Sequence, residues 1–238
     1  MSESVLIAST AKLNRQELAA VPTPPGTATH RPLPHVEVVE TLVETLSFRH
    51  IGVVKEEYAV SKDGMKMFGM VDLDTGMPGC RFSIGVRNSH DRSMRLAAVV
   101  GVRVLVCENM AFSGDFQPVL AKHSKKLLSM QNVLSIGVDQ MQRNFDGMRK
   151  QVGAWRESQL SDTTAKLIIY RAFIESDLDV PKHLARSVHD LYFHPQHEEF
   201  QQRTMWSLSN AFTSAFKQLE PIPQFRATAK LAGFLEHA

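Results

Sequence analysis

The chain has 238 residues, of which 43% are hydrophobic and 22% charged, and its 27 Lys and Arg against 25 Asp and Glu leave a formal net charge of +2. This composition excludes a largely disordered chain, a collagen-like fibre and a disulfide-stapled miniprotein. The near-zero net charge identifies no class of partner, so the distribution of charge along the chain has to be used instead.

The sequence predicts a cytoplasmic protein. Residues 1–21 lack the basic start and the apolar stretch of a signal peptide, and no apolar segment approaches the ~20 residues that cross a bilayer. The two cysteines, Cys80 and Cys107, form no metal or redox motif. Such cysteines are typical of a protein in a reducing compartment.

Residues 1–34 are expected to be an extended arm, because they end in the proline-rich stretches 21–26 and 31–34. Proline fixes its own φ and favours extended geometry in the residue before it. A helix is predicted next, since Val36, Val39 and Val43 recur at steps of three and four.

Between Ile51 and Asn109 the apolar period changes to two, which is typical of β-strands. Turn signals at 62–64 and 74–79, and a polar loop at 88–93, divide this stretch into four strands. We therefore expect a four-stranded antiparallel meander with one buried face and one solvent-facing face.

A long amphipathic helix is predicted over 118–157, because nine apolar residues from Leu127 to Trp155 follow at steps of three and four. Its interior glycines cost up to ~1 kcal/mol each. Packing must therefore supply much of its stability, and we expect this helix to join the subunits of a homo-oligomer.

Three shorter helices follow, the first two with expected caps at Ser161 and Asp179, and one or two amphipathic turns after Pro221 and Pro223 end the chain. The order of elements predicts an α+β protein. Its expected parts are an extended proline-rich arm (1–34), a core of helix, meander and long helix (35–157), and a helical C-terminal part packed on the core (158–238).

Several motifs carry a resemblance to a known family. They are the entry segment Thr29-His30-Arg31-Pro32, the loop Asn88-Ser89-His90-Asp91, the Arg103 strand ending in Cys107-Glu108-Asn109, and the stretch Thr204–Thr213 of the form Thr-x-Trp-x-Leu-x-Asn-Ala-x-Thr. With them the chain resembles phage- and plasmid-borne proteins that carry a domain of unknown function numbered nine-three-two. Relatives often have glycine where this chain has Arg92 and Met110. The resemblance implies a mobile-element origin and no particular chemistry.

Positive charge is concentrated in residues 81–156, which carry 12 basic and 5 acidic residues. We expect three arginines on the solvent-facing side of the meander, three basic residues at its rim and three lysines at the start of the long helix. Arginine forms forked hydrogen bonds with phosphate. The candidate nucleic-acid-binding residues are therefore Arg81, Arg87, Arg103, His90, Arg92, Arg95, Lys122, Lys125 and Lys126. The competing interpretation is a solvated face whose arginines pair with nearby acids.

These features favour a non-enzymatic nucleic-acid-binding protein of a phage or plasmid. Its expected partner is DNA, single-stranded rather than duplex, and its expected role is annealing in recombination. The order of helix, antiparallel strands and long helix is similar to the core of phage single-strand annealing proteins, which is an analogy of fold alone. The alternative is a protein-interaction module of a mobile element, for example in counter-defence. No cofactor and no membrane contact are expected.

Three local patterns are weaker candidates for an enzyme or a metal site. Ser89, His90 and Asp91 are consecutive, so their side chains diverge and cannot relay a proton. Cys107 and His90 could act together only if the fold brought them into contact. The spacing of His189, His194 and His197, interrupted by a proline, does not place three metal ligands on one helical face.

Overall fold

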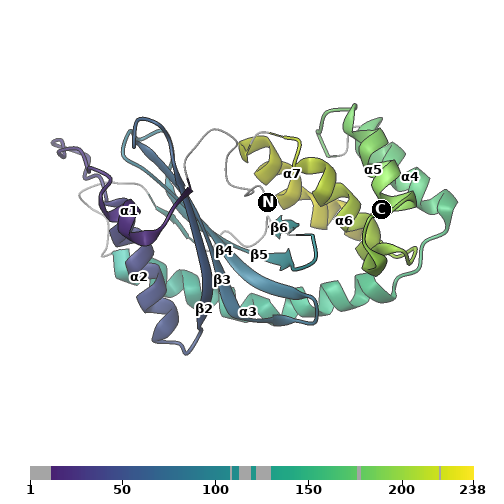
Figure 1. Ribbon diagram of the computed structural model, residues 1–238, viewed down its shortest axis with the longest axis horizontal. Helices are drawn as coiled ribbons and strands as arrows, with labels where there is room; N and C mark the ends of the chain where they lie inside the picture. Colours follow the sequence, from purple (N-terminus) through teal and green to yellow (C-terminus); the bar gives the residue numbers. More distant parts are fainter. Residues whose placement is uncertain (1–11, 108, 113–118, 122–129, 176–177, 220) are drawn as a thin grey trace. The chain divides into compact units, whose positions relative to one another are not determined.

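The computed structural model describes residues 12–107, 109–112, 119–121, 130–175, 178–219 and 221–238 (Figure 1). Over these residues the chain is an α+β protein with an antiparallel sheet, as the sequence predicts. It divides into two compact units. The first comprises Met1–Gly101 and Phe116–Phe145, and the second comprises Val102–Asp115 and Asp146–Ala238.

The expected meander is present, but three short strands extend it, so the prediction of a four-stranded sheet is wrong in number. The strand order is β1-β2-β3-β4-β5-β6, with β7 beside β5. The strands are β1 (Lys12–Leu13), β2 (Val53–Val60), β3 (Lys66–Met77), β4 (Cys80–Ser89), β5 (Leu96–Val104), β6 (Met110–Phe112) and β7 (Val119–Ala121). The added strands are only two or three residues long and are too short to show a period in the sequence.

The register of the meander is set by its two tight turns. Strands β2 and β3 pair from Val53↔Leu73 to Val60↔Met67, and β3 and β4 pair from Lys66↔Ser89 to Met77↔Cys80. Gly64 (φ 71°) and Gly79 (φ 72°) close these turns in the left-handed region that glycine adopts without steric cost.

Strand β5 lies inside the sheet, with β4 on one side and β6 and β7 on the other. All nine of its residues are buried. The alternation of the sequence predicts Arg103 on the solvent-facing side of this strand. That expectation is wrong, because Arg103 is only 6% exposed.

The expected extended leader contains a short helix, α1 (Arg15–Ala19), capped by Asn14. The guanidinium of Arg15 donates to the carboxylate of Glu56 on β2. The hydroxyl of buried Tyr58 donates to the same carboxylate at 2.5 Å. Burial, reinforced by this bond, raises the pKa of Tyr58. These contacts hold the first helix of the leader against the sheet.

Helix α2 (His35–Ser47) buries Val39 and Leu46 of the predicted apolar stripe, whereas Val36 and Val43 are half-buried. The next long helix in the chain, after the strands, is α3 (Met130–Glu157). The rings of Phe82 and Phe145 stack at 4.3 Å and pack α3 against β4. Because Phe82 and Asn88 lie six positions apart on β4, their side chains share one face of that strand.

The predicted start of the long helix at 118 is wrong, because Val119–Ala121 form β7 and pair with Leu96–Ala98. Residues 118 and 122–129 lie outside the described residues. From Met130 to Val152 the predicted apolar face is buried, for example at Leu134, Val138 and Met141.

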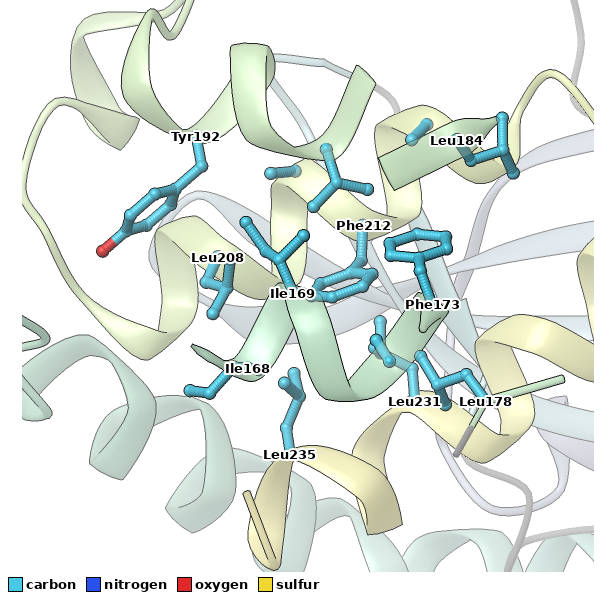
Figure 2. Close-up of a cluster of buried hydrophobic side chains, with 14 of the residues drawn as sticks. Ile168, Ile169, Phe173, Leu178, Leu184, Tyr192, Leu208, Phe212, Leu231 and Leu235 are labelled. Carbon is cyan, nitrogen blue, oxygen red and sulfur yellow. The ribbon is translucent and has the colours of Figure 1, made fainter. Parts of the chain in front are cut away.

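The second unit is mainly helical and encloses a core built by four helices (Figure 2). They are α4 (Asp162–Phe173), α5 (Leu184–Phe193), α6 (Met205–Phe216) and α7 (Pro221–Glu236), with a short 3-10 helix at Glu198–Phe200. Ile169, Phe173 and Phe212 belong to this core, and the rings of Phe173 and Phe212 stack. Helix α7 has 16 residues, which is longer than the one or two turns expected.

No described helix combines the length and the apolar character that a membrane span requires.

Candidate nucleic-acid interface

Three segments of the first unit meet at one end of the meander. In an antiparallel meander the β2–β3 turn and the β4–β5 loop lie at the same end of the sheet. The amide of His90 donates to the carbonyl of Met65 at 2.7 Å, which ties the loop to the turn. The ring Nε2 of His30 lies 3.0 Å from the carbonyl of His90, which ties the leader to the loop.

Positive side chains gather in these three segments. Residues 27–35, 61–66 and 88–95 contain five basic side chains and two acidic ones. Four of the basic side chains are exposed, and we call them the loop-end surface: Arg31, Lys62, Arg92 and Arg95. The fifth, Lys66, lies 3.6 Å from Asp91.

The two carboxylates at this end are engaged locally. Asp63 accepts hydrogen bonds from the hydroxyl of Ser61 and the amide of Met65, and these bonds lower its pKa. Burial acts to raise the pKa of Asp91, but hydrogen bonds from Ser93 and the charge of Lys66 outweigh it, and the pKa is lowered. Both carboxylates therefore stay ionised near neutral pH. They reduce the positive charge of this end of the sheet but do not cancel it.

Arg92 occupies an unusual backbone position, with φ of 64°. A side chain in the left-handed region carries a steric cost that glycine avoids. Glycine would adopt this conformation without that cost. One terminal nitrogen of Arg92 donates to Thr27 Oγ1 at 2.8 Å, so the guanidinium also holds the leader.

Beneath the loop-end surface lies a buried cluster of polar rings and an amide. His30, His35, Asn88 and His90 are between 0% and 6% exposed. Asn88 Nδ2 and His90 Nε2 both lie 2.9 Å from the carbonyl oxygen of Leu33. The motif residues of the entry segment and of the Asn-Ser-His-Asp loop therefore meet inside the protein.

The prediction that His90 is a surface residue is wrong, since the ring is only 4% exposed. Its neighbours also have separate partners. Ser89 Oγ donates to the carbonyl of Met94, and Asp91 accepts from Ser93. The three consecutive side chains are thus engaged in different directions, and the triad interpretation finds no support in their contacts.

The other predicted residues differ in exposure. Arg81 and Arg87 on β4 are half-buried. Arg87 and Arg103 each interact within the protein. Lys122, Lys125 and Lys126 lie outside the described residues. Of the predicted nucleic-acid-binding residues in the described part of the chain, only Arg92 and Arg95 are exposed. The other two cations of the loop-end surface, Arg31 and Lys62, were not among the predicted residues.

A second motif cluster stands in the second unit and joins the end of the Arg103 strand to helix α6. Asn109, 1% exposed, donates to the carbonyl of Asn210 at 3.1 Å and to Ser214 Oγ at 2.8 Å. Ser214 in turn donates to Asn109 Oδ1 at 3.1 Å. The family-like stretches around Asn109 and Asn210 therefore form a buried hydrogen-bonded contact.

Metal and thiol chemistry find little support among the described residues. No group of three His, Cys, Asp or Glu side chains there could hold a metal ion. Burial raises the pKa of the Cys107 thiol, with opposing contributions from the amide of Asn109 and the charge of Lys217. A raised pKa lowers the fraction of reactive thiolate.

Comparison with protein families places these clusters in context. The family model for a domain of unknown function (DUF932) matches residues 27–232, which include the leader motif and both buried clusters. Searches of the curated proteins and of the solved structures gave no match. Because the match covers most of the sequence, the chain belongs to the DUF932 family.

Proposed function

We propose that this protein is a non-enzymatic nucleic-acid-binding protein of a phage or plasmid, and that it binds single-stranded DNA through the loop-end surface. The observation that carries the proposal is the gathering of four exposed cations from three segments at one end of the sheet. Guanidinium and ammonium groups bind phosphate strongly, and arginine does so through paired hydrogen bonds.

The mode of binding follows from the side chains of this surface. It carries cations and contains no exposed aromatic ring on which a base could stack. Contacts to phosphates fix position and carry no sequence information. We therefore propose binding that is insensitive to base sequence. The preference for single strands, and a role in annealing, rest on the similarity of element order to phage annealing proteins.

The test is a titration of a fluorescently labelled single-stranded oligonucleotide at two salt concentrations, with the duplex of the same sequence as competitor. If about four phosphates are contacted, the logarithm of the affinity falls by about three per tenfold increase in salt. Absence of binding at the lower salt concentration would contradict the proposal. Tighter binding of the duplex would contradict only the single-strand preference.

Self-association through the long helix is a further part of the proposal, now limited to residues 130–157. Ile136 on α3 is 60% exposed, although large apolar side chains on the same helix are buried. Burial of this side chain in a subunit contact would remove apolar surface from water. Light scattering should give an assembly larger than one chain, and Ile136→Asp should shift it to the monomer. A monomeric wild-type protein would contradict this part.

The alternative function, a protein-interaction module, is favoured by a groove of the first unit. The groove has a volume of about 470 Å³ and is lined in part by Glu40, Val43, Glu44 and Phe48. Phe48 is 77% exposed at the groove. Phe48→Ser should leave DNA binding unchanged if the loop-end surface is the functional one.

A further inference from the structure

The buried histidines hold the leader to the end of the sheet. His30 belongs to the leader, His35 begins helix α2, and His90 follows strand β4. The rings of His35 and His90 stack with centroids 3.9 Å apart and planes 5° from parallel. Asn88, 0% exposed, contacts both the leader and His35.

The hydrogen bonds specify which ring nitrogens carry hydrogen. Nε2 of each histidine faces a backbone carbonyl. That of His30 lies 3.0 Å from the carbonyl of His90, and that of His35 lies 3.0 Å from the carbonyl of Gly64. Nε2 of His90 lies 2.9 Å from the carbonyl of Leu33. A carbonyl only accepts, so each Nε2 must donate. His35 Nδ1 lies 2.8 Å from the amide nitrogen of Asn88, which is a donor. His35 Nδ1 must therefore accept, and the ring is neutral.

His90 is also suited only to the neutral form. Its Nδ1 is buried and has no hydrogen-bond partner in the described residues. A proton there would place a charge against the stacked ring of His35. Burial is the main cause that lowers the pKa of His90, and His30 adds to it. The bond to the Leu33 carbonyl and the charge of Asp91 act in the opposite direction.

The charged and titratable groups around this pair come from every segment packed on it. The leader contributes His30, helix α2 contributes His35, and the β4–β5 loop contributes Asp91. Strand β3 contributes Lys66, whose ammonium lies 3.6 Å from Asp91. The β2–β3 turn contributes Asp63, which accepts hydrogen bonds from Ser61 and Met65. Both nearby carboxylates are thus already engaged, and they do not offset protons on both rings.

We propose that this cluster is a pH-sensitive latch, which holds leader residues 27–34 on the sheet while the rings are neutral and releases them when His35 and His90 take up protons. Protonation of His35 at Nδ1 turns this nitrogen from an acceptor into a donor, so that it faces the donor Nδ2 of Asn88. Protonation of both rings places two stacked imidazolium ions in contact. Release of the leader exposes the rings to water and removes both conflicts.

The direction of the pH dependence follows from proton linkage. The released state binds protons with the ordinary histidine pKa of about 6.5, and the latched state binds them less well. The latched state therefore has its full stability above about pH 6.5 and loses it as the pH falls below that value. One pH unit lower, each histidine that stays unprotonated in the latched state favours release by about tenfold.

Hydrogen exchange measured by mass spectrometry on the full chain tests the latch. After correction for the intrinsic effect of pH on amide exchange, the protection of residues 27–34 should fall at least tenfold between about pH 7.5 and pH 5.5. The protection of β4 should change far less. Constant protection of the leader over this range would overturn the proposal.

A variant separates the latch from general acid sensitivity. His90→Gln retains an amide donor near the position of Nε2 but cannot titrate, so the fall in leader protection should shrink by about tenfold. The control His194→Gln removes an exposed histidine and should behave as wild type. An unchanged pH dependence in His90→Gln would overturn the proposal.

If His90→Gln leaves the leader unprotected at both pH values, an NMR titration of the wild type decides. Signals of His90 and of residues 27–34 should shift together, with an apparent pKa below the ordinary value. Independent titration of the two would overturn the proposal. None of these readouts requires DNA, so failure of the latch and failure of the proposed function are distinguishable.

Discussion

At the residue scale, the family motifs of this chain act mainly through buried contacts. Asn88 and His90 bind the carbonyl of Leu33, and Asn109 binds the backbone and side chains of α6. A buried polar side chain requires such partners, and the loss of one partner leaves another polar atom without hydrogen bonds. The motifs therefore specify the fold around the candidate surface and contribute few surface groups themselves.

Exchange of the buried Asn109 for a carboxylate tests this view of the second cluster. Asn109→Asp replaces a donor that faces the carbonyl of Asn210 with an acceptor of similar shape. We expect a loss of about 2–4 kcal/mol in the free energy of unfolding, measured by chemical denaturation. Gln140→Glu introduces the same charge at an exposed position and should cost less than about 0.5 kcal/mol. Equal effects of the two substitutions would contradict a structural role for Asn109.

Arg92 combines a strained backbone with a candidate binding side chain, so the two contributions can be separated. In Arg92→Gly the left-handed φ of 64° becomes unstrained, while the bond to Thr27 and a positive charge are lost. We expect thermal stability to stay within about 0.5 kcal/mol of wild type because these effects offset. Affinity for the labelled oligonucleotide should nevertheless fall severalfold.

Ala28→Gly provides the control for that measurement, because it is exposed in the same leader and lies outside the left-handed region. This substitution should leave the affinity unchanged. If Arg92→Gly also binds as wild type, Arg92 is not part of the interface.

At the element scale, one arginine joins the two helices on the sheet of the first unit. Arg49, just after α2, donates to Asp139 at 2.6 Å and to the hydroxyl of Ser135 at 2.6 Å, both on α3. It also donates to the carbonyl of Ser135. The hydrogen bond with Asp139 raises the pKa of Arg49 and lowers that of the carboxyl group. Helix α3 is therefore attached by directed bonds as well as by the stacked rings of Phe82 and Phe145.

Removal of this connection should weaken the helix contact. Arg49→Met keeps an unbranched apolar stem and removes the three bonds to α3, and we expect the free energy of unfolding to fall by about 1–2 kcal/mol. Arg143→Met, at an exposed position of the same helix, is the matched control and should have little effect. A loss of stability in the control as large as that in Arg49→Met would show that general helix charge, and not this contact, is responsible.

The elements with long regular patterns were predictable from sequence, and the irregular ones were not. Alternation of Cys80, Phe82 and Ile84 identified β4, and Ser161 caps α4 as predicted, with its hydroxyl accepting from the amide of Thr164. Asp179 does not cap α5, which begins at Leu184 after His183. Asp179 has φ of 52°, a conformation that local sequence preferences did not reveal.

The candidate surface was only half predictable, for reasons of topology. Arg92 and Arg95 were expected at the rim because they lie in a polar loop between strands. Lys62 and Arg31 were missed. Alternate connections of an antiparallel meander lie at the same end of the sheet, so the β2–β3 turn with Lys62 is at the same end as that loop. Arg103 is buried on β5, and the short strands β6 and β7 beside β5 leave no pattern in the sequence.

At the scale of the whole molecule, location of charge matters more than its total. The net charge of +2 does not itself indicate binding to DNA. Charges of one sign on a small surface raise the local potential and attract the opposite charge. The proposed function therefore requires that phosphate binding depend on the loop-end surface specifically, and two double variants with the same net charge can decide it.

The decisive measurement compares the affinity for single-stranded DNA of Lys62→Glu/Arg95→Glu with that of Lys182→Glu/Arg226→Glu. All four positions are exposed, and each double variant changes the net charge equally. Reversal at Lys62 and Arg95 should weaken binding at least tenfold, because two phosphate contacts become repulsive. Reversal at Lys182 and Arg226 should have little effect. Equal losses in the two variants, or no loss in the first, would contradict the loop-end surface as the site of binding.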